Sequence, residues 1–287
     1  TLDDALALEQ ALTPDSRVLI VGAGLIGLKC AEGICGRAAK ITVCDLADRV
    51  LSSILDADTA PMVSGLLESK GLELLLGDSV ARFEPGKAHM RGGKTVEFDV
   101  LVTAVGVRPN TGLVRDAGGA VNRGIVIDET MATSLPGVYA AGDCAEGYDL
   151  SLGANRVLAL LPSAYIQGYT AGVNMAGGRQ VFDRGIPMNA IGFFGMHIMT
   201  AGTYVSEAGG GRVFAWSQGG KVKKFFCKDG LLKGYILIDA VDRGGIYTAL
   251  IREQTPLDTV DLPLLVREPT FMAFPAQARK EKFASEV

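Results

Sequence analysis

The sequence of 287 residues predicts the α/β class, with a three-layer domain built on a parallel sheet in its N-terminal part. Two observations support this prediction. Short apolar runs, RVLIV, KITVCD and LELLLG, alternate with longer segments in which apolar residues have helical spacing. A glycine-rich turn joins the first run to the helical segment that follows it. Because parallel strands need such crossovers, the pattern favours successive β-α-β units.

The elements of this domain are expected in order from residue 1 to Gly106. A short helix over residues 1–12 precedes the first strand. From Ser79 to Phe98, the segments SVARFEP, KAHMRGG and KTVEF alternate around Pro-Gly and Gly-Gly turns, which is typical of an antiparallel meander. DVLVTAVG then returns as a buried strand. The first part of the chain is therefore a β-α-β-α-β unit with a β-meander crossover.

The rest of the chain predicts two further domains. Residues 108–177 contain the strands GIVID and GVYAAGD and a helix from about Ala164 to Gly177. Residues 178–287 contain four strand-like segments, a hairpin turn at residues 228–230, a helix in GGIYTALIREQ and an extended tail. We expect domains at 1–107, 108–177 and 178–287. The last is a smaller α+β domain that serves as an interface and makes the protein a homo-oligomer.

Composition and charge exclude several classes of protein. The net charge of −4 argues against a general nucleic-acid binder, which would have a basic surface. The longest apolar stretches, Val18–Cys30 and Leu158–Ala171, are interrupted by Gly, Lys, Pro, Gln or Tyr, so no membrane span is expected. The five cysteines are an odd number in apolar contexts, and no signal peptide is visible. These features predict a cytoplasmic protein.

The glycine-rich turn has the spacing G-x-G-x-x-G between a strand and a helix. Gly22 makes the tight turn, Gly24 lets the backbone approach a pyrophosphate, and Gly27 allows close packing of strand and helix. Leu25 and Ile26 lie between them, where N–H groups of the first helical turn can bind an anion. The unit is therefore predicted to be a nucleotide-binding domain of Rossmann type.

Asp45 ends the second strand, about 20 residues after the glycines, as the dinucleotide fingerprint requires. A carboxylate at this position accepts hydrogen bonds from the ribose 2′-hydroxyl and repels a 2′-phosphate. No pair of arginines replaces it, and Arg49 alone is interpreted as a charge at a helix start or phosphate rim. NAD is therefore the expected cofactor, with NADH preferred over NADPH.

Four ordered motifs, GAGLIG, AVGVRPNT, TSLPGVYAAGDCAE and AYIQGYTAGVNMAG, carry a resemblance to a known family. The chain resembles the pyridine nucleotide-disulfide oxidoreductases, which are flavoproteins with two dinucleotide-binding domains. The resemblance is closest to the branch of NADH oxidases, rubredoxin or ferredoxin reductases and the flavin module of nitrite reductases. It is strong over residues 1–177 and weak beyond them.

The resemblance implies an FAD site in addition to the NAD site. It assigns Gly142 and Asp143 to FAD and places Gln167 at the opening of a helix that runs past the flavin. It also places Gly106 in the NADH cleft. The alternative role for Asp143 is an N-cap for a helix in the segment that follows it.

The chain departs from the family pattern in two places. A first G-x-G-x-x-G for the ADP part of FAD is missing, so the FAD site is partial and an N-terminal FAD-binding segment becomes an expected partner. Whether that segment was removed or comes from a separate polypeptide stays open. Lys29 occupies a position where relatives usually carry Glu. It is either a charge on the nicotinamide and flavin side or a solvated lysine.

The leading hypothesis is an FAD-dependent NADH:acceptor oxidoreductase, an enzyme that passes hydride from NADH to flavin and then electrons to an acceptor. The sequence does not identify this acceptor. No catalytic acid or base is assigned, because His89 and His197 stand outside a His-Glu pair and hydride transfer needs none. No metal site is expected. The alternative is a non-catalytic NAD-binding subunit or redox-sensing module.

Overall fold

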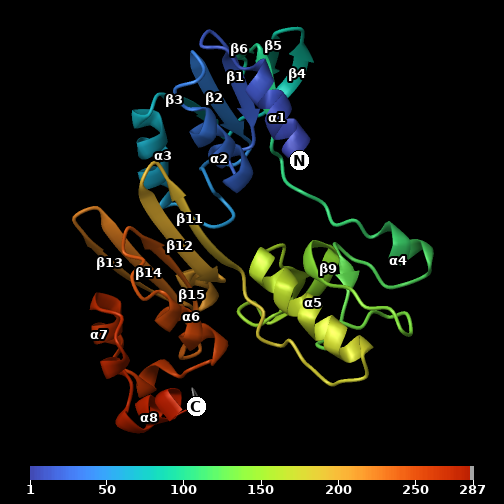
Figure 1. Cartoon of the computed structure of the whole chain (residues 1–287). Helices are drawn as coiled ribbons and strands as arrows, with labels where there is room; N and C mark the ends of the chain where they lie inside the picture. The colour runs from blue at the N-terminus through green and yellow to red at the C-terminus, as the bar shows by residue number, and fades with distance from the viewer. Residues whose placement is uncertain (285–287) are drawn as a thin grey trace. The chain divides into compact units, whose positions relative to one another are not determined.

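The computed structural model describes residues 1–284, which fall into two compact units (Figure 1). The first is Thr1–Val107, and the second begins at Arg108. No further boundary divides the second unit, so the expected separation of 108–177 from 178–287 stays a prediction. The α/β class itself is confirmed, because the first unit holds a parallel sheet with helical crossovers.

The first unit is built on a four-stranded parallel sheet of order β3-β2-β1-β7. Its strands are β1 Arg17–Val21, β2 Lys40–Asp45, β3 Leu72–Leu76 and β7 Val100–Thr103. Its helices are α1 Leu2–Ala11, α2 Leu25–Ile34 and α3 Ala60–Ser69. β1 and β2 are apolar and nearly completely buried, because both are central strands covered on two faces.

An antiparallel meander supplies the third layer of this unit. It consists of β4 Val80–Glu84, β5 Lys87–Met90 and β6 Thr95–Glu97. Ala88, Met90 and Val96 of the meander pack with Leu19 and Cys44 of the parallel sheet in one apolar core. The three-layer domain with a β-meander crossover, predicted from the sequence, is therefore confirmed.

One expectation for this sheet was wrong. The segment Asp99–Gly106 was expected to be a buried strand, but β7 ends at Thr103 and its residues alternate between half-buried and exposed. Leu101 keeps 38% of its surface exposed. The reason is position: β7 pairs only with β1 and forms an edge of the sheet, where covering is incomplete.

The second unit begins with a small mixed sheet and one long helix. Its elements are α4 Gly112–Asp116, β8 Ile125–Val126, the 3₁₀ turn η1 Gly142–Cys144, β9 Ala145–Asp149, β10 Ala154–Val157 and α5 Leu161–Met175. The predicted strand GVYAAGD is wrong, since that segment forms only an isolated bridge between Tyr139 and Ala132. The helix expected from Ala164 begins at Leu161, because Pro162 fits its first turn.

The remaining strands form a five-stranded antiparallel sheet of order β11-β12-β15-β14-β13. They are β11 Met188–Phe193, β12 Met196–Gly202, β13 Arg212–Gln218, β14 Lys221–Lys228 and β15 Leu231–Ile238. Asp229 and Gly230 both have positive φ in the predicted hairpin turn between β14 and β15. The predicted helix is α6 Gly245–Arg252, whose Tyr247 packs against Phe225 and Tyr235 of the sheet.

The extended tail predicted after this helix was wrong. It contains the helices α7 Leu262–Arg267 and α8 Ala276–Ala284 and the short 3₁₀ turns Leu257–Thr259 and Phe271–Ala273. A further 3₁₀ turn, Glu207–Gly209, lies earlier, between β12 and β13. Asp261 accepts the Leu264 N–H and so caps α7. Among the helices of residues 1–284, none combines the length and apolar character that a bilayer crossing requires.

Candidate functional site

The glycine turn after β1 leaves α2 without a side-chain cap. Gly24 is its N-cap residue, and the first N–H groups of the helix have no intrahelical partners. A Cβ on Gly22 would lie 2.2 Å from the Ala104 carbonyl oxygen, and one on Gly27 would lie 2.0 Å from the Gly22 carbonyl oxygen. A Cβ on Gly24 would meet no atom within 4 Å. Two glycines thus serve internal packing, whereas the third faces open space.

Asp45 is fixed beside this turn by two hydrogen bonds. Its carboxylate accepts the Ala23 N–H at 2.6 Å and the Ala47 N–H at 2.8 Å. The carboxylate therefore stabilises the glycine turn and keeps lone pairs for further donors. Arg49 is held by an ion pair to Asp48 at 2.7 Å and by a bond to the Leu55 carbonyl, which gives it a structural role.

The carboxyl ends of β1, β2 and β7 meet at one edge of the parallel sheet, where ligands of open α/β sheets bind. Gly106 follows β7 at this edge, with φ of +101°. Apolar side chains there remain exposed: Ile26 of the first α2 turn, Leu46 after β2 and Val105 beside Gly106. The predicted NAD-site residues therefore lie together at this edge, and the apolar side chains beside them are exposed.

Lys29 lies on α2, one turn from Glu32, with which it forms an ion pair. Its side chain keeps 54% of its surface exposed. This arrangement agrees with the solvated alternative for Lys29. A role on the nicotinamide and flavin side stays a prediction.

Gly142 and Gln167 come together in the second unit, on η1 and α5. The Gly142 N–H donates to the Gln167 side-chain oxygen at 2.8 Å, and Gln167 is buried. Gly142 has φ of +78°, a conformation that glycine adopts without strain. Gln167 lies in the second turn of α5, not at its opening as the resemblance implied, because the helix starts at Leu161.

Asp143 is exposed, and the alternative role for it was wrong. A 3₁₀ turn and strand β9 follow it, so there is no helix for its carboxylate to cap. Cys144 ends the same 3₁₀ turn, and its thiol donates to the Ala141 carbonyl at 3.4 Å. All five cysteines are free thiols in this structure.

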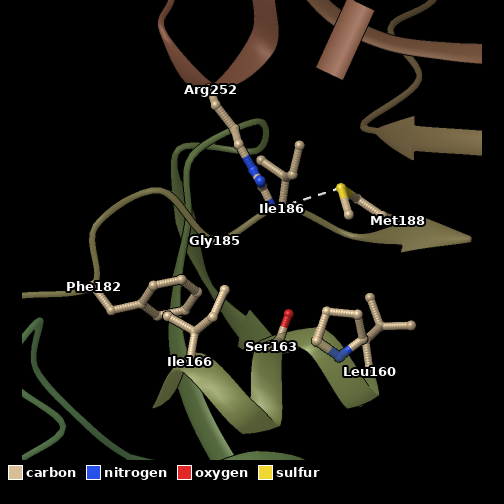
Figure 2. Close-up of a pocket in the computed structure, with 9 residues that line it drawn as sticks. Leu160, Ser163, Ile166, Phe182, Gly185, Ile186, Met188 and Arg252 are labelled. Carbon is tan, nitrogen blue, oxygen red and sulfur yellow. Dashed lines mark hydrogen bonds between the residues drawn. The ribbon is translucent and has the colours of Figure 1, made fainter. Parts of the chain in front are cut away.

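Two features near α5 were missed from the sequence. Leu161, Tyr165, Tyr169 and Met175 form an exposed apolar stripe along the helix, 62–84% exposed. The spacing of four residues between the first three was the signal that could have revealed it. In a second-unit pocket, Arg252 of α6 bonds to the Met188 sulfur at 3.6 Å, and Ser163 of the first α5 turn also lines that pocket (Figure 2).

The Nε of Arg252 is buried and has no hydrogen-bond partner among the described residues. A guanidinium beside the N-terminus of a helix adds to the positive potential of the helix dipole. The Arg252 guanidinium therefore reinforces the positive potential at the first turn of α5, although the pocket itself holds only about 10 Å³. Within residues 1–284, no group of three His, Cys, Asp or Glu side chains is placed to hold a metal ion.

Known proteins are similar to this chain in sequence. The chain is 32% identical over 265 residues to the NADH-dependent phenylglyoxylate dehydrogenase subunit epsilon of Aromatoleum evansii, covering 90% of this chain and 63% of the relative. It is 34% identical over 183 residues to an NADH oxidase of Methanocaldococcus jannaschii, covering 62% and 41%. The chain thus spans less than two thirds of these relatives.

Solved structures share the fold of this chain. The chain superposes on a chain of the covalent putidaredoxin reductase–putidaredoxin complex with a TM-score of 0.84 at 22% identity, over 99% of this chain and 67% of that one. The sequence profile of the family described as pyridine nucleotide-disulphide oxidoreductase matches residues 1–168. Since that match covers more than half of the chain and includes Gly22, Gly24 and Gly27, the chain belongs to the pyridine nucleotide-disulphide oxidoreductase family.

Proposed function

We propose that the chain is the NADH-binding part of an FAD-dependent NADH:acceptor oxidoreductase. The observation that carries the proposal is the glycine turn, in which Gly24 leaves open space above an uncapped helix N-terminus while Asp45 stands beside it. A pyrophosphate fits the first feature, because helix N–H groups and the helix dipole bind anions. The adenosine ribose fits the second, because a carboxylate accepts hydrogen bonds from its hydroxyls.

Asp45 also supports the choice of NADH over NADPH. Its carboxylate is fixed by two backbone donors, so it cannot swing away from an incoming 2′-phosphate without losing both bonds. Arg49 is already engaged by Asp48 and the Leu55 carbonyl and offers no unpaired cation. Both curated relatives described above carry NADH in their names.

FAD fits the second unit in part. The exposed carboxylate of Asp143 suits ribitol hydroxyls, which can donate hydrogen bonds to it, and the Gly142 backbone beside it is held by Gln167. When both cofactors are bound, they supply the hydride-transfer chemistry, and the protein supplies position and electrostatics. The acceptor in this proposal is a partner protein, since one relative is named as a subunit of a dehydrogenase.

The longer protein is proposed to cover the apolar stripe on α5 with its remaining FAD-binding segment. The stripe, Leu161, Tyr165, Tyr169 and Met175, is too apolar for a surface that stays in water. The relatives described above are longer than this chain, so they contain additional residues that could pack against this stripe.

The test compares two glycines of α2 and its turn. Gly24→Ala adds a methyl group where the pyrophosphate would lie, whereas Gly33→Ala adds one on the same helix away from the turn; both positions have open space. We expect calorimetry to show NADH affinity reduced about tenfold by Gly24→Ala, equal to about 1.4 kcal/mol, and unchanged by Gly33→Ala. Equal NADH affinity in the two variants would contradict the proposal. Circular dichroism of both variants is the control that each one folds.

A further inference from the structure

A second pocket lies in the second unit, away from α5 and its cofactor-side features. It encloses about 290 Å³ between β13, β14, the segment after β15 and the end of α7. That size is near the lower limit of small-molecule sites. Trp216 of β13 and Lys223 of β14 are register partners, so their side chains leave the same face of the sheet toward this pocket.

Lys223 is the unusual residue of this pocket. It is only 6% exposed, and its ammonium lies 5.1 Å from the centre of the Trp216 ring. The ammonium donates to the Arg267 carbonyl at 2.9 Å, which uses one of its three N–H donors. Burial lowers the pKa of Lys223, and the charges of Glu268 and Asp242 oppose that shift. Glu268 and Asp242 lie too far from the ammonium for an ion pair within 4 Å, so an anion in the pocket would reduce the cost of burying this charge.

The pocket lining carries more positive than negative charge. Its cations are Lys221, Lys223, Arg243 and Arg267, and its anions are Asp242 and Glu268. Within the described residues, no ion pair shorter than 4 Å joins any of these cations to a carboxylate. The lining residues therefore carry a net charge of +2, from four cations and two anions, although the whole chain carries −4.

We propose that this pocket binds the phosphate dianion of a small phosphorylated molecule or of free phosphate. A dianion matches the net charge of the lining, and clustered Arg and Lys side chains donate the charge-assisted bonds that phosphate oxygens accept. The phosphate sits between the Lys223 ammonium and the guanidinium groups, and Trp216 forms the apolar side of the site. This site is independent of the proposed NADH function, which rests on the first unit.

The chain contains a built-in reporter for this site, since Trp216 is its only tryptophan. Inorganic phosphate and glycerol phosphate are titrated separately, at ionic strength fixed with sodium chloride, and tryptophan emission is recorded. We expect a saturable change with one or both. Saturation by inorganic phosphate alone identifies free phosphate as the ligand, and tighter saturation by the ester identifies a phosphorylated molecule.

Variants locate the binding. Arg243 has φ of +54°, a left-handed conformation, so Arg243→Gly removes the guanidinium, with its 3.5 Å bond to the Pro269 carbonyl, and relieves backbone strain. We expect at least tenfold weaker phosphate binding in Arg243→Gly and in Lys223→Met. Lys228→Met, at the end of the same strand, is the matched control with wild-type affinity.

Three outcomes would overturn the proposal: a response that sodium chloride reproduces, affinity unchanged in Arg243→Gly, or saturation by a glutamate-rich peptide but not by either phosphate. The last would identify the pocket as a contact for an acidic protein. If Lys223→Met fails to fold, Arg243→Gly and the exposed Lys221→Met decide the matter. NADH affinity measured in the same variants stays unchanged under the proposal, so its failure is distinguishable from failure of the NADH site.

Discussion

The glycine turn of the first unit and the Gly142 segment of the second each join a positive-φ glycine to a nearby aspartate, but they use these residues differently. Asp45 accepts two backbone N–H groups, one of them from the turn itself. Asp143 is exposed and caps no helix. The first arrangement is complete within its own unit. In the second, the hydrogen bond between Gly142 and Gln167 holds the backbone, and the aspartate is exposed.

The same contrast extends to the surroundings. Packing explains Gly22 and Gly27, whose added Cβ atoms would collide with backbone, and it leaves Gly24 for a ligand. On α5, packing explains Gln167 and leaves the stripe of Leu161, Tyr165 and Tyr169 exposed. A site that a unit supports alone can be preorganised before its ligand arrives, whereas a site shared with another segment is completed only on assembly.

The largest expected effect of this contrast concerns flavin retention. The chain should bind NADH but lose FAD. Its sequence contains no second glycine turn with a ribose carboxylate that could bind the ADP half of FAD. Such charge-assisted contacts contribute about 1.5–3 kcal/mol each, so the loss of two lowers affinity by about 100-fold or more. The measurement is the absorbance spectrum after incubation with excess FAD and desalting. Stoichiometric retained flavin would break the comparison.

The second prediction concerns the completeness of the first unit. Gly27→Ala places a methyl group against the Gly22 carbonyl, 2.0 Å away, and neither backbone segment can move without disturbing β1 or α2. We expect a loss of about 3 kcal/mol in the free energy of unfolding, the upper range for overpacking. Urea denaturation of the variant beside Gly33→Ala measures it. A difference below 1 kcal/mol between the two variants would mean that the turn is plastic and not preorganised.

The third prediction sharpens the role of Asp45. Replacing Asp45 by Asn and the exposed Leu46 by Arg removes a negative charge and adds a cation where a 2′-phosphate would lie. The wild type should prefer NADH over NADPH by about 10- to 100-fold, equal to about 1–3 kcal/mol, and the double variant should reverse most of that preference. Calorimetric titrations of both nucleotides at fixed salt measure it. Equal affinities in the wild type would refute the assignment.

Sequence patterns predicted the first unit better than the second, for physical reasons. The runs RVLIV and KITVCD are buried on two faces, so apolarity alone identifies β1 and β2. The exposure of β7 depends on its edge position, which no local pattern encodes. GVYAAGD has the apolar character of a strand but finds no continuous partner, and only a bridge forms.

The tail and the candidate sites show the same division. The helix cap at Asp261 and the proline after it were visible signals for α7. The three-residue geometry of Gly22, Gly24 and Gly27 followed from motif spacing, because that spacing reflects backbone constraints. The pocket around Lys223 was not predictable, since it combines β13, β14, α7 and the segment after β15, which are far apart in sequence.

The smallest expected effect belongs to Lys29, and it tests whether the first unit contains any unused charge. Its side chain is 54% exposed and paired with Glu32 one turn away, an arrangement that contributes at most about 0.5 kcal/mol. Lys29→Gln should therefore change the free energy of unfolding by less than that amount and leave NADH affinity unchanged. Chemical denaturation and calorimetry measure both quantities in the chain alone.

The remaining possibility for Lys29 is a charge on the flavin side, and its test requires the protein joined to an FAD-binding segment. If the cation stabilises reduced, anionic flavin, Lys29→Glu should lower the flavin midpoint potential. An unchanged potential and an unchanged rate of reduction by NADH would assign Lys29 to the helix surface.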